Sequence, residues 1–327
     1  LRAYNDLDHI APIIWKMSSV DIPTLYMFVD NQFRDDYRVK LFANSGAQEI
    51  RSSTLDNYYN KLRKRLRWQA LIRWSDGVLS RVLGSRFLIE NNIGVVVAEW
   101  GGPNGKSKMP FVLRPARRLG IPTVAVPHGY HTWYNNDFNA TTAMVIKKTG
   151  LLPQLTNRNL YTNYIVQSEN IRRYCIESGI KKEKLYVLGS TRFCKEWSDI
   201  NRNLCIQNHS QKGDLRRPVV VFFLNHWTYN VDREKCINLI KKLSEEKIEL
   251  IIKGHTRGVT SGTLTCAEEA LLEKSGTVSF AGPEAHSPAL VGLADVVIVY
   301  GSSICFEALR QRKQICRPLY LCRNNTI

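Results

Sequence analysis

The sequence predicts an α/β protein made of two domains, each built on a parallel β-sheet. Short apolar runs, which are typical of buried parallel strands, alternate along the chain with segments of helical spacing. The 327 residues are enough for two domains with substantial cores. A polar and uneven stretch at 199–217 separates the alternation into two series. We therefore expect an N-terminal domain over 1–198, a linker over 199–217 and a C-terminal domain over 218–327.

The first series of elements forms the expected N-terminal domain. Its strongest strand is Ile93-Gly-Val-Val-Val-Ala-Glu-Trp100, and a helix and a second strand follow in the order of a right-handed βαβ unit. Residues 33–50 show a mixed pattern. The expected elements are a helix over 8–20, a strand over 23–29, mostly helix over 54–91, strands over 93–100 and 121–126 around a helix over 108–119, and strands over 164–168 and 185–190 around a helix over 169–179.

The second series forms the expected C-terminal domain and starts with a strongly apolar strand. Strands and helices again alternate, as a second parallel sheet requires. The expected elements are strands over 218–224, 248–253, 277–280, 296–299 and 315–321, with helices over 231–246, 266–275 and 287–293 and a further helix that begins at 302 or 303.

The composition indicates a globular protein whose partners are anionic. The net charge is +17, and no apolar run is long enough for a transmembrane helix. The eight cysteines form no CxxC pair, which favours reduced thiols and a cytoplasmic protein. The segment 61–74 has the pattern of a basic amphipathic helix, so we expect either peripheral contact with an anionic membrane or an ordinary solvated helix. No recognition motif for nucleic acid accompanies the charge, so we expect no nucleic-acid partner.

Polar residues follow the predicted strands in both domains. Ligands of open parallel sheets bind at the carboxyl ends of the strands, so these side chains should meet in a cleft between the domains. The N-terminal domain contributes Glu99, His128 and Arg192. The C-terminal domain contributes Asn225, His226, His255, Ser302, Ser303 and Glu307.

The stretch 294–309 combines a strand, a tight turn and a helix. Gly301 permits the turn, and Ser302 or Ser303 is a good N-cap residue for the helix. The start of that helix offers N–H groups to an anion, and Glu307 is placed to accept hydrogen bonds from hydroxyls. These features describe a nucleotide-sugar site, although an ordinary strand–helix unit would have the same pattern.

Four segments resemble GT-B fold glycosyltransferases that build bacterial surface polysaccharides, such as capsule, lipopolysaccharide and teichoic-acid-type enzymes. They are Pro127-His-Gly129, Tyr186-Val-Leu-Gly-Ser-Thr-Arg-Phe193, Lys253-Gly-His-Thr-Arg257 and the stretch from Asp295 to Leu309. The order and spacing of the four carry the resemblance. The sequence departs from the family at two points. Thr256 stands where the family has proline, and Phe193-Cys194 stands where the family's segment ends in an acidic residue. Retaining Kdo transferases carry an acidic residue at the start of the corresponding loop, and none stands at 127–128. This absence favours an inverting reaction, or Glu99 as the acidic group.

The resemblance implies two Rossmann-like domains of the GT-B class that face an interdomain cleft. The implied reaction moves a sugar from a CMP-, CDP- or UDP-linked donor to a glycan or lipid-linked acceptor, without cofactor or metal. His128 is the first candidate for the base and Glu99 the second, with Gly129 and Arg192 elsewhere in the cleft. The candidate donor-binding residues are Asn225, His226, Lys253, His255, Arg257, Ser302, Ser303 and Glu307.

Three other functions fit parts of the pattern. A sugar-nucleotide 2-epimerase has the same two-domain fold, and a polyol-phosphate transferase of the CDP-glycerol type differs mainly in what the donor carries. A polyanion-binding module without catalysis would use the charge of +17 alone. That module predicts a continuous basic stripe and no clustering of polar groups at strand ends.

Overall fold

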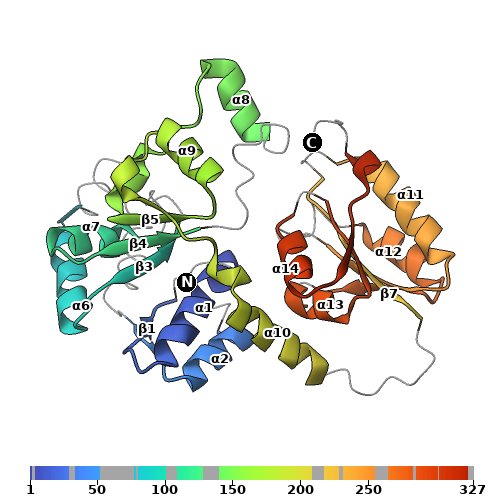
Figure 1. Cartoon of the computed structure of the whole chain (residues 1–327), viewed down its shortest axis with the longest axis horizontal. Helices are drawn as coiled ribbons and strands as arrows, with labels where there is room; N and C mark the ends of the chain where they lie inside the picture. The colour runs from blue at the N-terminus through green and yellow to red at the C-terminus, as the bar shows by residue number, and fades with distance from the viewer. Residues whose placement is uncertain are drawn as a thin grey trace. The chain divides into compact units, whose positions relative to one another are not determined.

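The computed structural model divides the chain into two compact units (Figure 1). Unit 1 comprises Leu1–His131 and Leu152–Arg192, and unit 2 comprises Thr132–Leu151 and Phe193–Ile327. The structure describes residues 1, 4–28, 34–51, 77–78, 80–100, 109–127, 140–207, 217–227, 231–254, 264–282, 285–300 and 302–322. The predicted membrane-contact segment 61–74 lies outside these residues. No described helix is both long and apolar enough to cross a bilayer.

Unit 1 is built on a parallel sheet of four strands in the order β3-β4-β5-β6. The register pairs Glu99 with Val126, the last residues of β3 and β4, so the carboxyl ends of these strands are level. Helix α7 connects β3 to β4, and α9 connects β5 to β6 (Figure 1). The bounds are β3 Val96–Glu99, α7 Pro110–Arg118, β4 Thr123–Val126, β5 Asn163–Val166, α9 Glu169–Glu177 and β6 Leu185–Val187.

The remainder of unit 1 is helical, with one short parallel pair of strands. Helix α1 packs against α2 and β3. Helix α2 falls in the segment 33–50 that shows a mixed pattern, and the Asp36 side chain caps it by accepting from the Arg38 N–H at 2.9 Å. The bounds are α1 Tyr4–Ser18, β1 Leu25–Tyr26, α2 Tyr37–Asn44, β2 Gln48–Glu49, η3 Ser80–Gly84, α6 Ser85–Glu90, η5 Thr156–Leu160, η6 Lys182–Lys184 and η7 Thr191–Phe193.

Unit 2 is built on a parallel sheet of five strands in the order β11-β10-β7-β8-β9. The chain starts at the central strand β7, adds β8 and β9 on one side, and then crosses back to add β10 and β11 on the other. The bounds are α8 Ala140–Thr149, α10 Lys195–Gln207, β7 Val219–Phe223, α11 Arg233–Ser244, β8 Glu249–Lys253, α12 Cys266–Glu273, β9 Val278–Ala281, α13 Ser287–Leu293, β10 Val296–Ile298, α14 Ile304–Arg310, β11 Gln314–Cys316 and η8 Leu319–Leu321.

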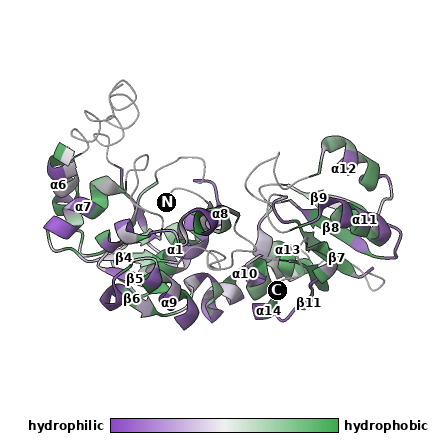
Figure 2. Cartoon of the chain, turned by 90° about the horizontal axis from the view of Figure 1, so that it is seen from above, coloured by the Kyte–Doolittle hydropathy of each residue, from purple (hydrophilic) through white to green (hydrophobic). Residues whose placement is uncertain are grey.

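Strand β7 is buried on both faces because its side chains alternate between two cores. Val220 and Phe222 belong to the core that includes Ile240 of α11. Val219, Val221 and Phe223 belong to the core that includes α13 and α14. Figure 2 accordingly shows the strands β7 and β8 in the hydrophobic colour, whereas α11 carries both colours. An entirely apolar strand is what a sheet covered by helices on both faces requires.

The unit boundary nearest the predicted linker falls between Arg192 and Phe193. Residues 199–207 of the predicted linker are helical, because α10 extends over Lys195–Gln207. Helix α10 packs on α13 and α14, buries Trp197 at 2% exposure, and follows Phe193, whose ring lies 5.6 Å from that of Phe306. Polar composition predicted a linker, but this segment forms a helix that makes tertiary contacts with α13 and α14 of unit 2.

Candidate functional site

The carboxyl edge of the unit 2 sheet collects several of the predicted donor residues. Asn225 follows β7, Lys253 ends β8, and Ser302 and Ser303 lie between β10 and α14. Since β8 and β10 flank β7 in parallel, these positions share one edge. The crevice between β7 and β10 is the topological switch point, because the connections leave β7 and β10 in opposite directions. Ligands of open α/β sheets bind at this point.

Asn225 joins the two strand ends at the switch point. Its side-chain amide donates to the Tyr300 carbonyl at 3.3 Å, and its backbone N–H donates to the Tyr300 hydroxyl at 3.3 Å. Its Oδ1 accepts from the backbone N–H of His226 at 3.1 Å. Burial raises the pKa of Tyr300, which keeps that hydroxyl neutral. Asn225 therefore sets the geometry of the edge and positions the half-buried His226.

Two buried charged residues stand at the same edge. Lys253 is 3% exposed, and its ammonium donates to the carbonyl of Gly282, just after β9. This contact ties β8 to β9 and uses one of the three ammonium donors. Glu307 is 1% exposed and shares the buried face of α14 with Ile304 and Ala308. Lysine and glutamate are almost never this buried without a specific interaction.

The turn before α14 differs in detail from the predicted cap. Ser303 is the capping residue, but its side chain makes no capping hydrogen bond. The Ser302 hydroxyl instead accepts from the Ile304 N–H at 3.4 Å. Both serines are partly exposed at the carboxyl edge of the sheet.

In unit 1, Glu99 ends β3 and is 5% exposed. Its backbone carbonyl accepts from the Tyr161 hydroxyl at 3.4 Å. Next to it, Arg158 donates to the Trp100 carbonyl and stacks over the Trp100 ring, with the guanidinium carbon 4.0 Å from the ring centroid. The carboxyl end of β3 thus has the buried Glu99 carboxylate and, in contact with the next residue Trp100, the guanidinium of Arg158 from η5.

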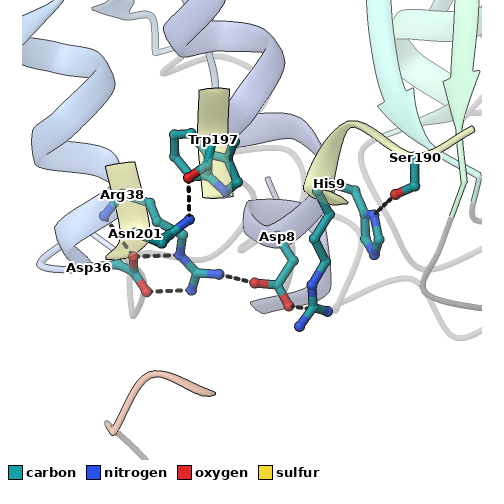
Figure 3. Close-up of polar contacts among 8 residues, drawn as sticks. Asp8, His9, Asp36, Arg38, Ser190, Trp197 and Asn201 are labelled. Carbon is teal, nitrogen blue, oxygen red and sulfur yellow. Dashed lines mark hydrogen bonds and ion pairs between the residues drawn. The ribbon is translucent and has the colours of Figure 1, made fainter. Parts of the chain in front are cut away.

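Arg192 belongs to an ion-pair network inside unit 1, of which Asp8, Asp36 and Arg38 are labelled in Figure 3. It contacts the Asp8 carboxylate at 3.0 Å, and the other oxygen of Asp8 contacts Arg38. The segment after β6 is further attached to α1, because Thr191 donates to the His9 carbonyl at 2.7 Å and the Ser190 hydroxyl lies 3.3 Å from His9 Nδ1. Arg192 therefore has a structural partner within unit 1.

Four candidate residues lie outside the described residues: His128, Gly129, His255 and Arg257. Conversely, the structure adds polar residues that the sequence did not indicate, namely Asp8, Arg38, Arg158 and Tyr300. Asp8 and Arg192 are 184 positions apart, so no local pattern could have paired them. Within the described ranges, no group of three or more histidine, cysteine or acidic side chains is arranged to hold a metal ion.

Comparison with known proteins assigns the fold. No protein-family model and no curated protein matches the chain. The UDP-GlcNAc 2-epimerase of Methanocaldococcus jannaschii, solved with UDP-GlcNAc and UDP, is similar over 96% of this chain and 81% of that one, with a TM-score of 0.54 and 12% identity. The Neisseria meningitidis UDP-GlcNAc 2-epimerase bound to UDP-GlcNAc gives a TM-score of 0.55 with 12% identity over 96% and 80%.

A glycosyltransferase from Rickettsia africae is similar over 96% of this chain and 76% of its own length, with a TM-score of 0.50 and 9% identity. Together with the two parallel sheets, these matches show that the chain has the GT-B fold, and the predicted fold class is confirmed. At such low identity the matches establish the architecture alone.

Proposed function

We propose that the chain is an enzyme that uses a nucleotide sugar, and that it transfers the sugar to a hydroxyl of a growing surface glycan. The observation that carries this proposal is the switch point of the unit 2 sheet, where Asn225 after β7 hydrogen-bonds to Tyr300 after β10. A nucleotide is the ligand class that such switch points hold in other α/β sheets. The GT-B fold over 96% of the chain supports the same substrate class.

The residues of the proposed donor site would have different roles. Lys253, His255 and Arg257 would stabilise the departing phosphate, since cations and N–H donors aimed at developing charge lower the barrier. Ser302 and Ser303 would contact the phosphate, and Glu307 would accept hydrogen bonds from sugar hydroxyls. Asn225 would hold the edge in shape and position His226.

The proposed reaction is a single displacement with inversion. The acceptor oxygen attacks the anomeric carbon, the bond from that carbon to the phosphate oxygen breaks, and the nucleotide leaves with the electron pair. The acceptor proton passes to a base of unit 1, with His128 as the first candidate and Glu99 as the second. The proposal includes no metal and no cofactor.

A sugar-nucleotide 2-epimerase is the second candidate. The M. jannaschii and N. meningitidis structures, both 2-epimerases with UDP-GlcNAc bound, support it. An epimerase needs a base for the proton at C2 of the sugar, and the buried carboxylates Glu99 and Glu307 are groups of that kind. A CDP-glycerol-type transferase would place the same nucleotide on unit 2.

Saturation-transfer NMR with CMP-, CDP-, UDP- and GDP-linked donors tests the substrate class. We expect one nucleotide to bind, and binding of nucleic acid without any nucleotide would refute the enzyme proposal in favour of a polyanion-binding module. Deuterium entering C2 in D₂O would identify the epimerase. Release of free nucleotide that depends on a glycan or lipid-linked acceptor would identify the transferase.

The base is tested in a separate experiment. A His128→Ala protein should keep its donor affinity and lose turnover, whereas a variant with full turnover excludes that base. Peripheral membrane contact through 61–74 and a cytoplasmic location stay predictions, and co-sedimentation with anionic vesicles tests the first.

A further inference from the structure

The amino edge of the unit 1 sheet carries a pocket of about 400 Å³. Three segments line it. Helix α7 ends there as the chain enters β4, η5 precedes β5, and η6 leads directly into β6. The strands of this sheet are parallel, so the pocket lies at the opposite end of the sheet from Glu99 and the carboxyl edge. It is therefore separate from the residues proposed for glycosyl transfer.

Four cationic side chains line this pocket from two sides. Arg114 and Arg117 are three residues apart on α7 and so lie on one helix face. Lys181 and Lys184 stand on the other side, where Lys181 directly precedes η6 and Lys184 is its last residue. No aspartate or glutamate is among the residues that line the pocket. Neither arginine forms an ion pair with a carboxylate in the part of the chain that the structure describes.

The wall opposite α7 is held in place by its own hydrogen bonds. The Lys184 ammonium donates to the carbonyls of Asn159 at 2.6 Å and Tyr161 at 2.8 Å. The Asn159 side chain donates to the Gly179 carbonyl at 2.9 Å and accepts from the Lys181 backbone N–H at 2.9 Å. Lys181 is thus fixed through its backbone, while its exposed side chain is available to a ligand.

The charges around the pocket repel one another. Burial lowers the pKa of Lys184, and the positive charges of Arg117 and Lys181 lower it further, whereas Glu183 acts in the opposite direction. Arg114 in the same way contributes to the lowered pKa of Arg118, after burial and Arg81. Like charges gathered in one pocket are stabilised when an anion binds between them.

We propose that this pocket binds a ligand through a phosphate group with two or more negative charges, held between Arg114 and Arg117 on one side and Lys181 on the other. Arginine side chains suit phosphate oxygens because their donors form a planar fork, and a lysine adds a point charge. The group can belong to a free phosphorylated compound or to the headgroup of an anionic lipid. The pocket depends on unit 1 alone and does not require the proposed glycosyl transfer.

Arginine modification by phenylglyoxal in the full chain, read at each residue by mass spectrometry, tests this proposal. The probes are pyrophosphate and, separately, vesicles of phosphatidic acid, whose phosphomonoester can carry two negative charges, with phosphatidylcholine. We expect a saturating probe to slow modification of Arg114 and Arg117 and to leave Arg173, an exposed arginine of α9, unchanged. Protection by pyrophosphate identifies a free phosphate ligand, and protection by vesicles alone identifies a lipid headgroup.

Two lysine variants supply the matched control. Lys181 and Lys182 are adjacent and exposed, but only Lys181 lines the pocket. Lys181→Gln should raise the probe concentration needed for protection roughly tenfold, the effect of one lost hydrogen bond to a charged group. Lys182→Gln removes the same charge and should leave it unchanged. Equal effects of the two variants, equal protection at Arg173, or no protection by either probe would overturn the proposal.

Discussion

Removing the guanidinium of Arg38 should lower the free energy of unfolding of unit 1 more than removing the guanidinium of an exposed arginine. Arg38 lies on α2 with a side chain only 3% exposed, and it holds two carboxylates (Figure 3). It contacts Asp36 through two bonds of 2.6 and 2.7 Å and also contacts Asp8. Arg38→Ala would therefore leave both carboxylates poorly solvated without their shared cation, in addition to losing the packing of the arginine stem.

The magnitude follows from the exposure of the partners. Breaking a buried ion pair by removing one member costs about 3–5 kcal/mol. The Asp36 and Asp8 side chains are 10% and 17% exposed, and Asp8 keeps Arg192 at 3.0 Å. Because some solvation and one ion pair remain, we expect the lower end, about 3 kcal/mol, for Arg38→Ala.

Urea unfolding followed by hydrogen exchange in α1 and α2 measures this cost, since two units need not unfold together. Arg51→Ala is the control, because Arg51 is 63% exposed and pairs with Glu49 at 3.1 Å. An exposed pair contributes at most about 1 kcal/mol. The reasoning is refuted if Arg38→Ala and Arg51→Ala lower the free energy of unfolding by the same amount.

Further predictions concern thiol reactivity, the pH dependence of stability, local stability and metal dependence. Burial raises the pKa of the Cys175 thiol to about 12 and that of Cys236 to about 11, so iodoacetamide at pH 8 should modify the exposed Cys266 and Cys316 and spare the two buried thiols. The raised pKa values also predict that stability is retained below about pH 9 and falls toward pH 12, because the unfolded chain loses these protons first; a stability that rises over that range contradicts this. Thr265→Ala removes the capping box of α12 and should cost about 1 kcal/mol in urea unfolding, where no change would argue against the cap. Turnover should be insensitive to EDTA, and a loss restored by added divalent metal would contradict the metal-independent reaction.

Strands could be predicted well because burial on both faces imposes an unmistakable pattern. Strand β7 corresponds to the predicted strand at 218–224. Strands β3 and β4, which pair in parallel, lie within the predicted strands at 93–100 and 121–126. Helices with mixed composition were missed, as with α2 and α10. Helix α10 is largely polar in composition, and its contacts with α13 and α14 are tertiary contacts that composition does not reveal.

The candidate site could be predicted only in part. The rule that ligands meet at the carboxyl ends of parallel strands placed Asn225 and Ser302 at one edge of the sheet, and the family resemblance added Lys253. What these side chains contact could not be predicted, because the partners of Asn225 and Lys253 follow strands that are neighbours in the sheet but far away in the sequence. The pocket at the amino edge was equally inaccessible, since Arg117 and Lys181 meet only through the folded sheet.

The central claim is that the carboxyl edge of unit 2 binds the nucleotide of a nucleotide sugar. Hydrogen exchange of the full chain with and without saturating CMP-, CDP-, UDP- or GDP-linked sugar tests it most directly. The account predicts that one donor protects the backbone amides at 224–227 and 302–305, while the amino edge of the same sheet, at 217–219 and 247–249, is unchanged. Protection at the amino edge, or no protection by any of the four donors, would contradict it.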